Sequence, residues 1–210
     1  MFTGTQSIAK WARANGYEDV VTLDIDAKSN ATHTVDVLDW DYRAAYPPGY
    51  FEWIHASVPC TEYSVAKTTA PRNLELADRI VMRTLEILSY FKPTTYTIEN
   101  PYTGMLRHRP FMALLTYTVV DYCQFHTPDD AFLYKKKTII FTNRIATLVK
   151  PRPLCDGACA GIKANEPGQR GHAVSFGGRR SGNRKMIVSN ISLAKKHRLP
   201  QGLLTWLMTG

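Results

Sequence analysis

The feature that most constrains the fold is a long amphipathic segment between two short apolar runs. Asn73 can cap a helix that Pro93 ends, and apolar residues recur between them at helical spacing. The runs on either side, residues 52–58 and 95–98, have the composition of β-strands. Strand, helix and strand in this order predict two parallel strands with the helix packed against them.

Other segments extend this alternation of strands and helices. A short helix is expected over residues 7–15, and strands are expected over residues 19–25, 33–38, 117–123 and 138–142. The last two strands are able to pair with each other. The whole pattern predicts an α/β fold with a mostly parallel sheet and helices on both of its faces. In such sheets, ligands bind beyond the carboxyl ends of the strands.

Residues with catalytic chemistry follow two of the predicted strands. Cys60 comes just after residues 52–58, and Glu99 comes just after residues 95–98. Because parallel strands end at the same edge of a sheet, the two side chains can meet there. A thiolate beside a carboxylic acid is suited to attack on an electron-poor ring such as a pyrimidine. The simpler alternative for Cys60 is a buried structural thiol.

The composition is that of a basic, soluble globular protein. Of 210 residues, 44% are hydrophobic and 21% are charged, and the formal net charge is +8. The positive charge favours a nucleic-acid partner, although good solubility alone also explains it. No run is long enough to cross a bilayer and no signal peptide opens the chain, so we expect a cytoplasmic protein without membrane contact.

The composition changes near residue 150, where proline, cysteine and glycine residues crowd together. A stretch rich in glycine, arginine and lysine follows at residues 169–185. We therefore expect a core over residues 1–143 and a small, irregular, basic insertion over residues 144–188. Residues 189–210 are expected to contain a helix that begins near Pro200 and packs back on the core.

Two cysteines in the insertion are close in sequence and can act as metal ligands. Cys155 and Cys159, with His172 and with Cys123 as a candidate fourth ligand, offer the thiolates and imidazole that zinc prefers. A metal can hold an irregular loop in one conformation. The alternative is that these cysteines are free thiols in a loop.

Six short motifs follow one another in a characteristic order. They are Phe2-x-Gly4, Asp24-x-Asp26, Asp36-Val37, Pro59-Cys60, Glu99-Asn100-Pro101 and the lysine-rich segment at residues 135–138. In this order they resemble the DNA cytosine C5 methyltransferases, especially the compact versions found in bacteriophages and large viruses. The resemblance covers about residues 1–143 and implies a Rossmann-like fold that binds S-adenosylmethionine. The chain departs from the family at Gln6 and Ser7, which replace glycines, and little sequence is available for a strand before Phe2.

The resemblance implies roles for residues near the cofactor. Gly4 lets the backbone approach the methionine part of S-adenosylmethionine, and Asp24 accepts hydrogen bonds from the ribose hydroxyls. Asp36 accepts a hydrogen bond from the adenine amino group. The implied cofactor-binding residues are Phe2, Gly4, Thr5, Asp24, Ile25, Asp36, Val37 and Pro59. Taken alone, each aspartate is more often a solvated loop residue than a ligand.

The same resemblance implies a covalent mechanism. Cys60 adds to C6 of a cytosine flipped out of the duplex, and Glu99 holds N3 and the exocyclic amine. Asn100 braces the loop, and Lys136 or Lys137 replaces the arginines that hold the base and the glutamate in the wider family. A solvated charge run is the alternative for these lysines. The implied catalytic residues are Cys60, Glu99, Asn100 and Lys136.

Contacts to DNA are expected next to Cys60 and in the basic insertion. Tyr63 and Ser64 are predicted to face the substrate phosphate or base, and arginines between glycines suit phosphates and base edges. The candidate nucleic-acid-binding residues are Ser64, Lys137, Arg170, Arg179, Arg180 and Arg184. A disordered basic loop is the alternative for the arginines.

The sequence therefore predicts a monomeric enzyme that methylates C5 of cytosine in DNA inside a bacterial or virus-infected cell. The altered glycine loop and a weak C-terminal motif leave open a lapsed homologue that only binds nucleic acid or cofactor. The same chemistry on RNA or on a free pyrimidine nucleotide is a further alternative.

Overall fold

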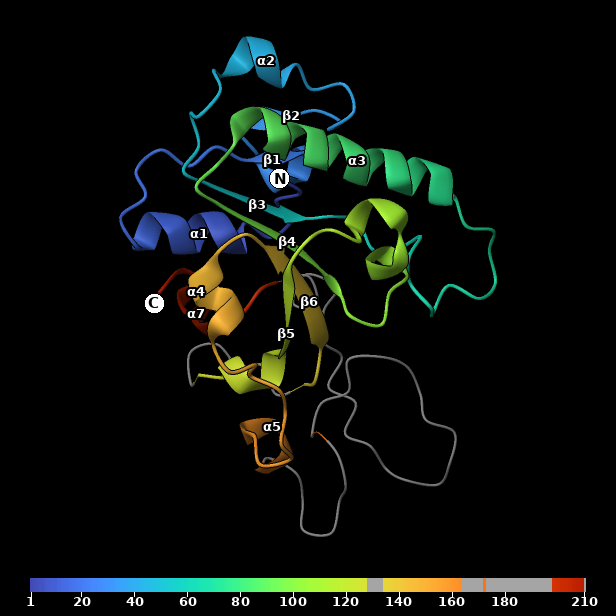
Figure 1. Ribbon diagram of the computed structural model, residues 1–210, viewed down its shortest axis with the longest axis vertical. Helices are drawn as coiled ribbons and strands as arrows, with labels where there is room; N and C mark the ends of the chain where they lie inside the picture. The colour runs from blue at the N-terminus through green and yellow to red at the C-terminus, as the bar shows by residue number, and fades with distance from the viewer. Residues whose placement is uncertain (128–133, 164–171, 173–197, 210) are drawn as a thin grey trace.

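The computed structural model describes residues 1–127, 134–163, 172 and 198–209, and a four-stranded sheet forms its centre (Figure 1). In spatial order the strands are β3 (Trp53–Ser57), β4 (Thr95–Pro101), β6 (Lys137–Thr142) and β5 (Tyr117–Asp121). β3 and β4 are parallel, whereas β6 is antiparallel to both of its neighbours. The predicted α/β class is confirmed, and the sheet is mixed because β6 runs against the other three strands.

The connection between β5 and β6 accounts for the mixed sheet. Parallel neighbours usually need an α-helical crossover, whereas antiparallel neighbours do not. The described part of this connection contains only a 3-10 helix, η4 (Tyr122–Phe125), so the chain turns back and β6 pairs with β5 in the opposite direction. β6 is also hydrogen-bonded to β4, which places it between the other two strands.

A two-stranded parallel sheet lies beside the central one. Its strands, shorter than the segments predicted from the sequence, are β1 (Leu23–Asp24) and β2 (His33–Thr34). The first two residues of the chain connect the two sheets. The Phe2 N–H donates to the Leu23 carbonyl (2.8 Å), and the Ser57 N–H donates to the Met1 carbonyl (3.4 Å). Residues 1–2 therefore occupy the place of a very short strand between β1 and β3.

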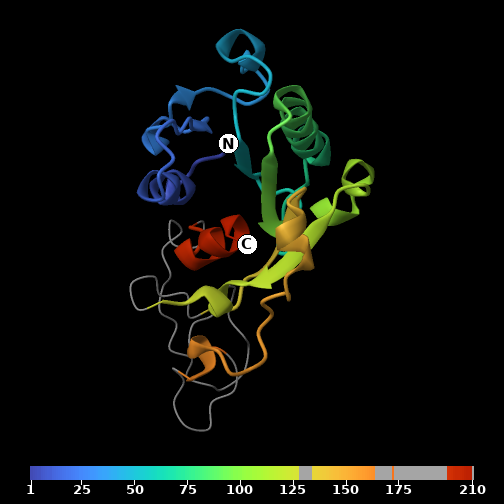
Figure 2. The same ribbon diagram turned by 60° about the vertical axis from the view of Figure 1, so that its left-hand side comes forward.

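Helices cover both faces of the central sheet (Figure 2). α3 (Leu74–Phe91) packs on one face in a core that includes Ile98 and Phe141. On the other face α1 (Ser7–Ala14) and α7 (Gln201–Met208) pack with Ile140, the residue before Phe141. Successive residues of a strand point to opposite faces, so β6 contributes to both cores.

The remaining helices are short, and the C-terminal helix lies against the sheet. They are α2 (Tyr42–Ala45), α4 (Ile145–Val149), α5 (Ala160–Lys163), η1 (Ala27–Ser29), η2 (Leu106–His108) and η3 (Pro110–Met112). In α7, the side chains of Leu203, Leu204 and Leu207 are at most 1% exposed. None of the helices in the described part of the chain is long and apolar enough to span a membrane.

The N-terminal cap of α3 gives a direct test of this fold. The Asn73 side chain accepts a hydrogen bond from the Leu76 N–H (3.0 Å). We expect Asn73→Ala to lower the free energy of unfolding by about 1 kcal/mol, because this N–H loses its acceptor. Urea unfolding followed by circular dichroism measures the change. Asn73→Ser keeps a capping oxygen and should stay near the wild-type value, and equal losses in both variants contradict the cap.

Candidate active site

The register of β3 and β4 brings Cys60 and Glu99 to the same edge of the sheet. Ser57 pairs with Glu99, and Cys60 follows three residues after Ser57. The Asn100 side chain donates to the Val58 carbonyl (3.1 Å) and is fully buried. This hydrogen bond holds the start of the cysteine loop against the end of β4, which is the bracing expected of Asn100.

Glu99 lies in a buried polar pocket with two donors. Its carboxyl Oε1 accepts from the Tyr122 hydroxyl (3.1 Å) and from Lys136 Nζ (3.2 Å). Glu99 is 6% exposed and Lys136 is 8% exposed. The Lys136 ammonium also lies 4.7 Å from the centre of the Tyr122 ring, within the range of a cation–π contact. A buried lysine is costly unless it is paired, so this arrangement does not fit a solvated charge run.

The three consecutive lysines have different surroundings. Lys136 points to Glu99, whereas Lys135 forms an ion pair with Asp121 (3.6 Å). Lys137 Nζ lies 5.4 Å from the centre of the Tyr102 ring. Of the two lysines that the sequence left open for Glu99, Lys136 is therefore the one that reaches it.

The Cys60 thiol is close enough to this pocket to respond to its charges. Burial raises the pKa of Cys60, the Glu99 carboxylate raises it further, and the Lys136 ammonium lowers it. The thiol is therefore neutral at neutral pH in the resting site. A nucleophilic thiolate requires removal of its proton, and the Lys136 ammonium favours that step.

The loop after Cys60 is held in place by a second polar group. Tyr63 is fully buried and its hydroxyl donates to Asp78 (2.8 Å), which also forms an ion pair with Arg109. The Met105 N–H donates to the Tyr63 carbonyl (2.9 Å). The expectation that Tyr63 faces the substrate is wrong, because its hydroxyl anchors the loop to α3. Ser64 is partly exposed and stays a candidate for substrate contact.

Arg72 fixes the backbone of the same loop. Its guanidinium donates to the carbonyls of Glu62 (2.9 Å), Ser64 (2.6 Å) and Lys67 (2.8 Å). The Glu62 carboxylate in turn pairs with Lys67 (2.6 Å). Three carbonyl oxygens held by one guanidinium leave the loop little freedom, which keeps Cys60 in a defined position.

Sequence reasoning did not identify Tyr122, Arg72 or Asp78. Tyr122 lies inside a segment that the sequence predicted as a strand, residues 117–123, and its place near the carboxyl end of that strand was the only available signal. Arg72 and Asp78 belong to no motif. Arg72 holds the backbone of the loop, and Asp78 acts through Tyr63.

The predicted cofactor loop is organised around Asp24. Its two carboxylate oxygens accept from the Gly4 N–H (2.8 Å) and the Asp26 N–H (2.9 Å). Each oxygen has two lone pairs, so both can accept a further hydrogen bond from a ribose hydroxyl. Gly4 has φ +48°, a conformation that favours glycine. Ile25 is 68% exposed beside Asp24, where an apolar ring can lie against it.

Gln6 stands where the family that the sequence resembles has a glycine, and its contacts hold the loop in place. It adopts a left-handed conformation (φ 57°), and its side-chain amide donates to the carbonyls of Ser29 (2.5 Å) and Asn30 (2.8 Å). Beside it lies a polar hollow of about 560 Å³. The hollow is lined by Gly4, Thr5, Gln6, Lys10, Arg13, Lys28, Ser29 and Asn30. The side chain of Gln6 thus ties the loop to the segment after β1.

The other predicted cofactor residues lie nearby in sequence and differ in exposure. Asp36 Oδ1 accepts from the Leu38 N–H (2.9 Å) and the residue is partly exposed. The Val37 side chain is buried in the core, so only its backbone is available for a cofactor. Phe2 is partly buried against the same core, and Pro59 is exposed. Their roles toward the cofactor stay predictions.

The chain is similar in sequence to a viral protein. The chain is 29% identical over 155 residues to the "Probable DNA (cytosine-5)-methyltransferase" of Frog virus 3 (isolate Goorha), and the match covers 68% of each protein. The resemblance to viral cytosine C5 methyltransferases is confirmed. No family model matches the chain.

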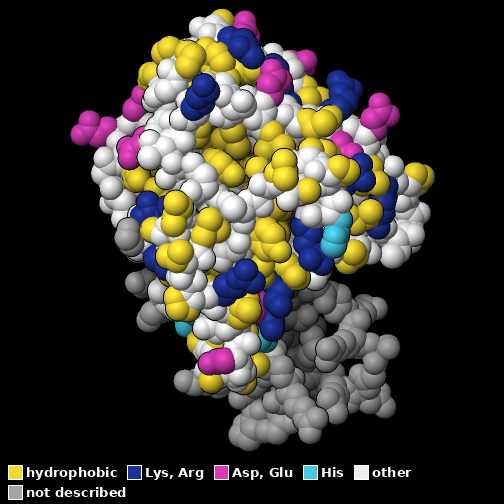
Figure 3. All heavy atoms as spheres, viewed as in Figure 1, with side chains coloured by type: hydrophobic (Ala, Val, Ile, Leu, Met, Phe, Trp, Pro, Cys, Tyr) yellow, Lys and Arg dark blue, Asp and Glu magenta, His cyan; other side chains and the backbone are white. Residues whose placement is uncertain are grey.

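Part of the predicted DNA-binding surface lies within the described residues. Lys137 and Arg107 both lie over the Tyr102 ring, Arg107 at 4.3 Å from its centre. Figure 3 shows acidic side chains mostly in the upper half of the face in view, whereas Lys and Arg also occupy its middle. The remaining candidates, Arg170, Arg179, Arg180 and Arg184, lie outside the described residues.

The candidate zinc ligands are gathered in one place. Cys155 Sγ lies 3.7 Å from Cys159 Sγ and 3.5 Å from His172 Nε2, and Cys159 Sγ lies 3.2 Å from the same nitrogen. Cys123 completes the group, in which all four ligand atoms lie within 4.8 Å of one another. Cys123, the candidate fourth ligand in the sequence, thus lies beside the other three.

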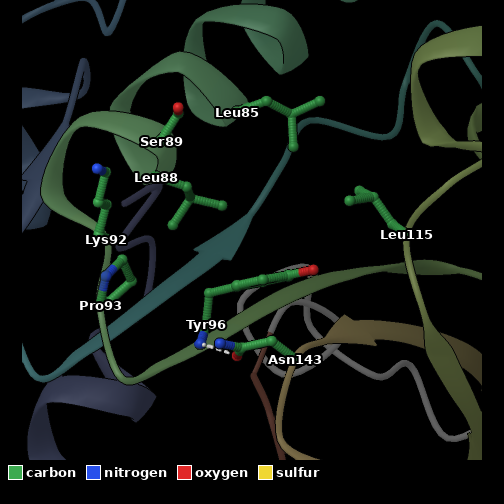
Figure 4. Close-up of a pocket in the computed structure, with 8 residues that line it drawn as sticks. All are labelled: Leu85, Leu88, Ser89, Lys92, Pro93, Tyr96, Leu115 and Asn143. Atoms are coloured by element: carbon green, nitrogen blue, oxygen red, sulfur yellow. Dashed lines mark hydrogen bonds between the residues drawn. The ribbon is translucent and has the colours of Figure 1, made fainter.

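An apolar hollow of about 420 Å³ lies away from the chemistry (Figure 4). Tyr96, near the start of β4, lies at its floor, and the Tyr96 N–H donates to the Asn143 side chain (2.8 Å). Glu99 lies toward the other end of the same strand. This hollow is therefore not part of the candidate active site.

The two charges beside Cys60 predict opposite effects on its reactivity. Glu99→Gln removes a negative charge and should lower the pKa of the Cys60 thiol, whereas Lys136→Gln removes a positive charge and should raise it. The pH dependence of Cys60 alkylation by iodoacetamide, followed by peptide mass spectrometry, measures both shifts. Arg43→Gln, an exposed charge near α3, is the control. Shifts in the same direction, or no shifts, contradict the shared pocket.

Proposed function

We propose that this protein transfers a methyl group from S-adenosylmethionine to C5 of cytosine in DNA. The observation that carries the proposal is that Cys60 follows β3 and Glu99 ends the parallel strand β4, with the Lys136 ammonium hydrogen-bonded to the Glu99 carboxyl group. The similarity to a viral protein named as a probable DNA (cytosine-5)-methyltransferase supports the same reaction. The formal net charge of +8 fits a polyanionic substrate.

Cys60 is the nucleophile in this proposal. Its thiolate adds to C6 of the cytosine ring, which makes C5 electron-rich. Loss of the C5 proton and release of Cys60 after methylation restore the aromatic ring. The target base must leave the duplex before C6 can reach the partly buried Cys60 thiol, so the enzyme flips it.

Glu99 recognises and activates the base. Because Tyr122 and Lys136 both contact Oε1, we assign the other carboxyl oxygen to N3 and the exocyclic amine of cytosine. Negative charge develops on the ring when Cys60 adds, and a proton shared between Glu99 and N3 stabilises it. The ammonium of Lys136 fixes the carboxyl group and reduces its negative field at Cys60.

The loop around Asp24 fits S-adenosylmethionine by its chemistry. A partly exposed carboxylate suits the ribose diol, and the exposed Ile25 suits the face of adenine. When bound, S-adenosylmethionine supplies an electrophilic methyl group on a sulfonium centre. Gly4 keeps the loop backbone free of a side chain where the cofactor approaches. In this proposal, residues 1–143 carry the chemistry, residues 144–188 contact DNA, and residues 189–210 pack back on the core.

The central test of this proposal is methylation by the wild-type protein and by Cys60→Ala. We expect bisulfite sequencing of DNA from cells that express the wild-type protein to show protected cytosines, and the variant to show none. Calorimetry should give similar affinities of both proteins for S-adenosylmethionine, because Cys60 is assigned to the base. DNA binding without methylation by the wild-type protein indicates a lapsed homologue, and methylation by Cys60→Ala refutes the mechanism.

The hydrogen bond from Tyr122 to Glu99 predicts a smaller effect. A hydrogen bond to a charged group contributes about 1.5–3 kcal/mol, so Tyr122→Phe should slow methyl transfer about 10- to 160-fold. Single-turnover kinetics with labelled cofactor measure the rate. Tyr117→Phe removes a hydroxyl at the other end of β5, where the ring is 43% exposed, and should leave the rate unchanged. Equal rates for the wild-type and Tyr122→Phe proteins remove Tyr122 from the assignment.

A further inference from the structure

Four metal-binding side chains converge from three separate parts of the chain. Cys123 lies in η4, Cys155 and Cys159 lie just before α5, and His172 comes thirteen residues after Cys159. Their ligand atoms all lie within 4.8 Å of one another. Cys123 is 2% exposed and Cys159 is 9% exposed. Cys155 and His172 are partly buried. Three thiols and one imidazole rarely gather in this way without a shared ligand, since free thiols gain little from each other.

The distances within this group match a tetrahedral metal site. Bonds of about 2.3 Å to sulfur and about 2.0 Å to nitrogen place two sulfur ligands about 3.8 Å apart, and a sulfur and a nitrogen about 3.5 Å apart. Cys155 and Cys159 are 3.7 Å apart at sulfur, and their distances to His172 Nε2 are 3.5 Å and 3.2 Å. A disulfide needs a sulfur separation of about 2.05 Å, so the cysteines are not bonded to each other.

We propose that Cys123, Cys155, Cys159 and His172 bind one structural zinc ion. Four protein ligands leave no open coordination position, which is typical of a structural rather than a catalytic site. Thiolates and imidazole favour zinc over the oxygen-binding cations magnesium and calcium. The site is separate from Cys60 and Glu99 and adds to the proposed methyltransferase function.

The backbone around the ligands is fixed by Asp121. This carboxylate is 1% exposed, and its Oδ2 accepts from the Cys155 N–H (2.9 Å). The Asp121 N–H in turn donates to the Pro153 carbonyl (3.0 Å). Lys135 pairs with Asp121 and adds a positive charge near a site with three thiolates. Supporting contacts of this kind are a regular feature of metal sites in proteins.

The zinc ion also affects the active site through the chain. Cys123 directly follows Tyr122, whose hydroxyl contacts Glu99. Binding of Cys123 to a metal fixes η4 and, with it, the position of Tyr122. We therefore infer that the ion joins the segment after Pro153 to the wall of the pocket that holds Glu99. In this role Cys123 is a positioning residue rather than a catalytic one.

Metal analysis of the full-length protein tests the zinc site. We expect about one zinc ion per chain, by mass spectrometry of the metal, after expression with zinc and dialysis against metal-free buffer. Cys155→Ser and His172→Ala should each reduce the zinc content at least tenfold. Cys60→Ser is the matched control and should retain the metal, because Cys60 lies outside the group. These readouts are independent of methylation, so they separate the zinc site from the proposed function.

Cobalt substitution gives a second readout on correctly folded protein. Cobalt bound by three thiolates and an imidazole should show the intense visible absorption of a tetrahedral site, and added zinc should remove it. Less than about a tenth of a zinc ion per chain, together with four thiols that react with a thiol reagent, overturns the proposal. A Cys155–Cys159 disulfide in freshly purified, unreduced protein overturns it as well.

Discussion

The parallel pairing of β3 with β4 fixes where the thiol and the carboxyl group meet. Ser57 lies opposite Glu99, so the loop that begins after β3 carries Cys60 over the end of β4. The hydrogen bond from the Asn100 side chain to the Val58 carbonyl stabilises this register at the carboxyl end of β3. A slip of one residue would turn Glu99 to the opposite face of the sheet, away from Lys136 and Tyr122. The core around Ile98 prevents such a slip, because it would also expose an apolar strand face.

The antiparallel direction of β6 is what brings Lys136 to Glu99. Thr138 pairs with Pro101, so the first residues of β6 lie at the carboxyl end of β4. A parallel β6 would begin at the opposite end, next to Thr95. β5 runs antiparallel to β6 and therefore in the same direction as β4, which brings Tyr122 to the same edge. The polar group around Glu99 thus depends on the mixed sheet, because β4, β5 and β6 bring Glu99, Tyr122 and Lys136 to the same edge.

The sequence predicted the residues that act at strand ends and missed those that depend on strand order. Cys60, Glu99 and Asn100 follow apolar runs, and parallel strands place such residues together. Tyr122 reaches Glu99 only because β6 lies between β4 and β5, and no local pattern reveals that order. Tyr63 was misjudged because its apolar ring is buried while its hydroxyl has a partner, Asp78, fifteen residues away. The first strands are shorter than predicted, and residues 1–2 supply the hydrogen bonds between the two sheets.

Three consecutive residues, the last of β5 and the first two of η4, make three different contacts. Asp121 holds the backbone of the segment that carries Cys155, Tyr122 donates to Glu99, and Cys123 enters the group of four metal ligands. Successive side chains at the end of a strand point in different directions, so one short segment can reach all three. A displacement of this segment therefore changes the Glu99 pocket and the ligand group together. The Cys3His group and the Glu99 carboxyl group are therefore parts of one structural unit, although their chemistry is different.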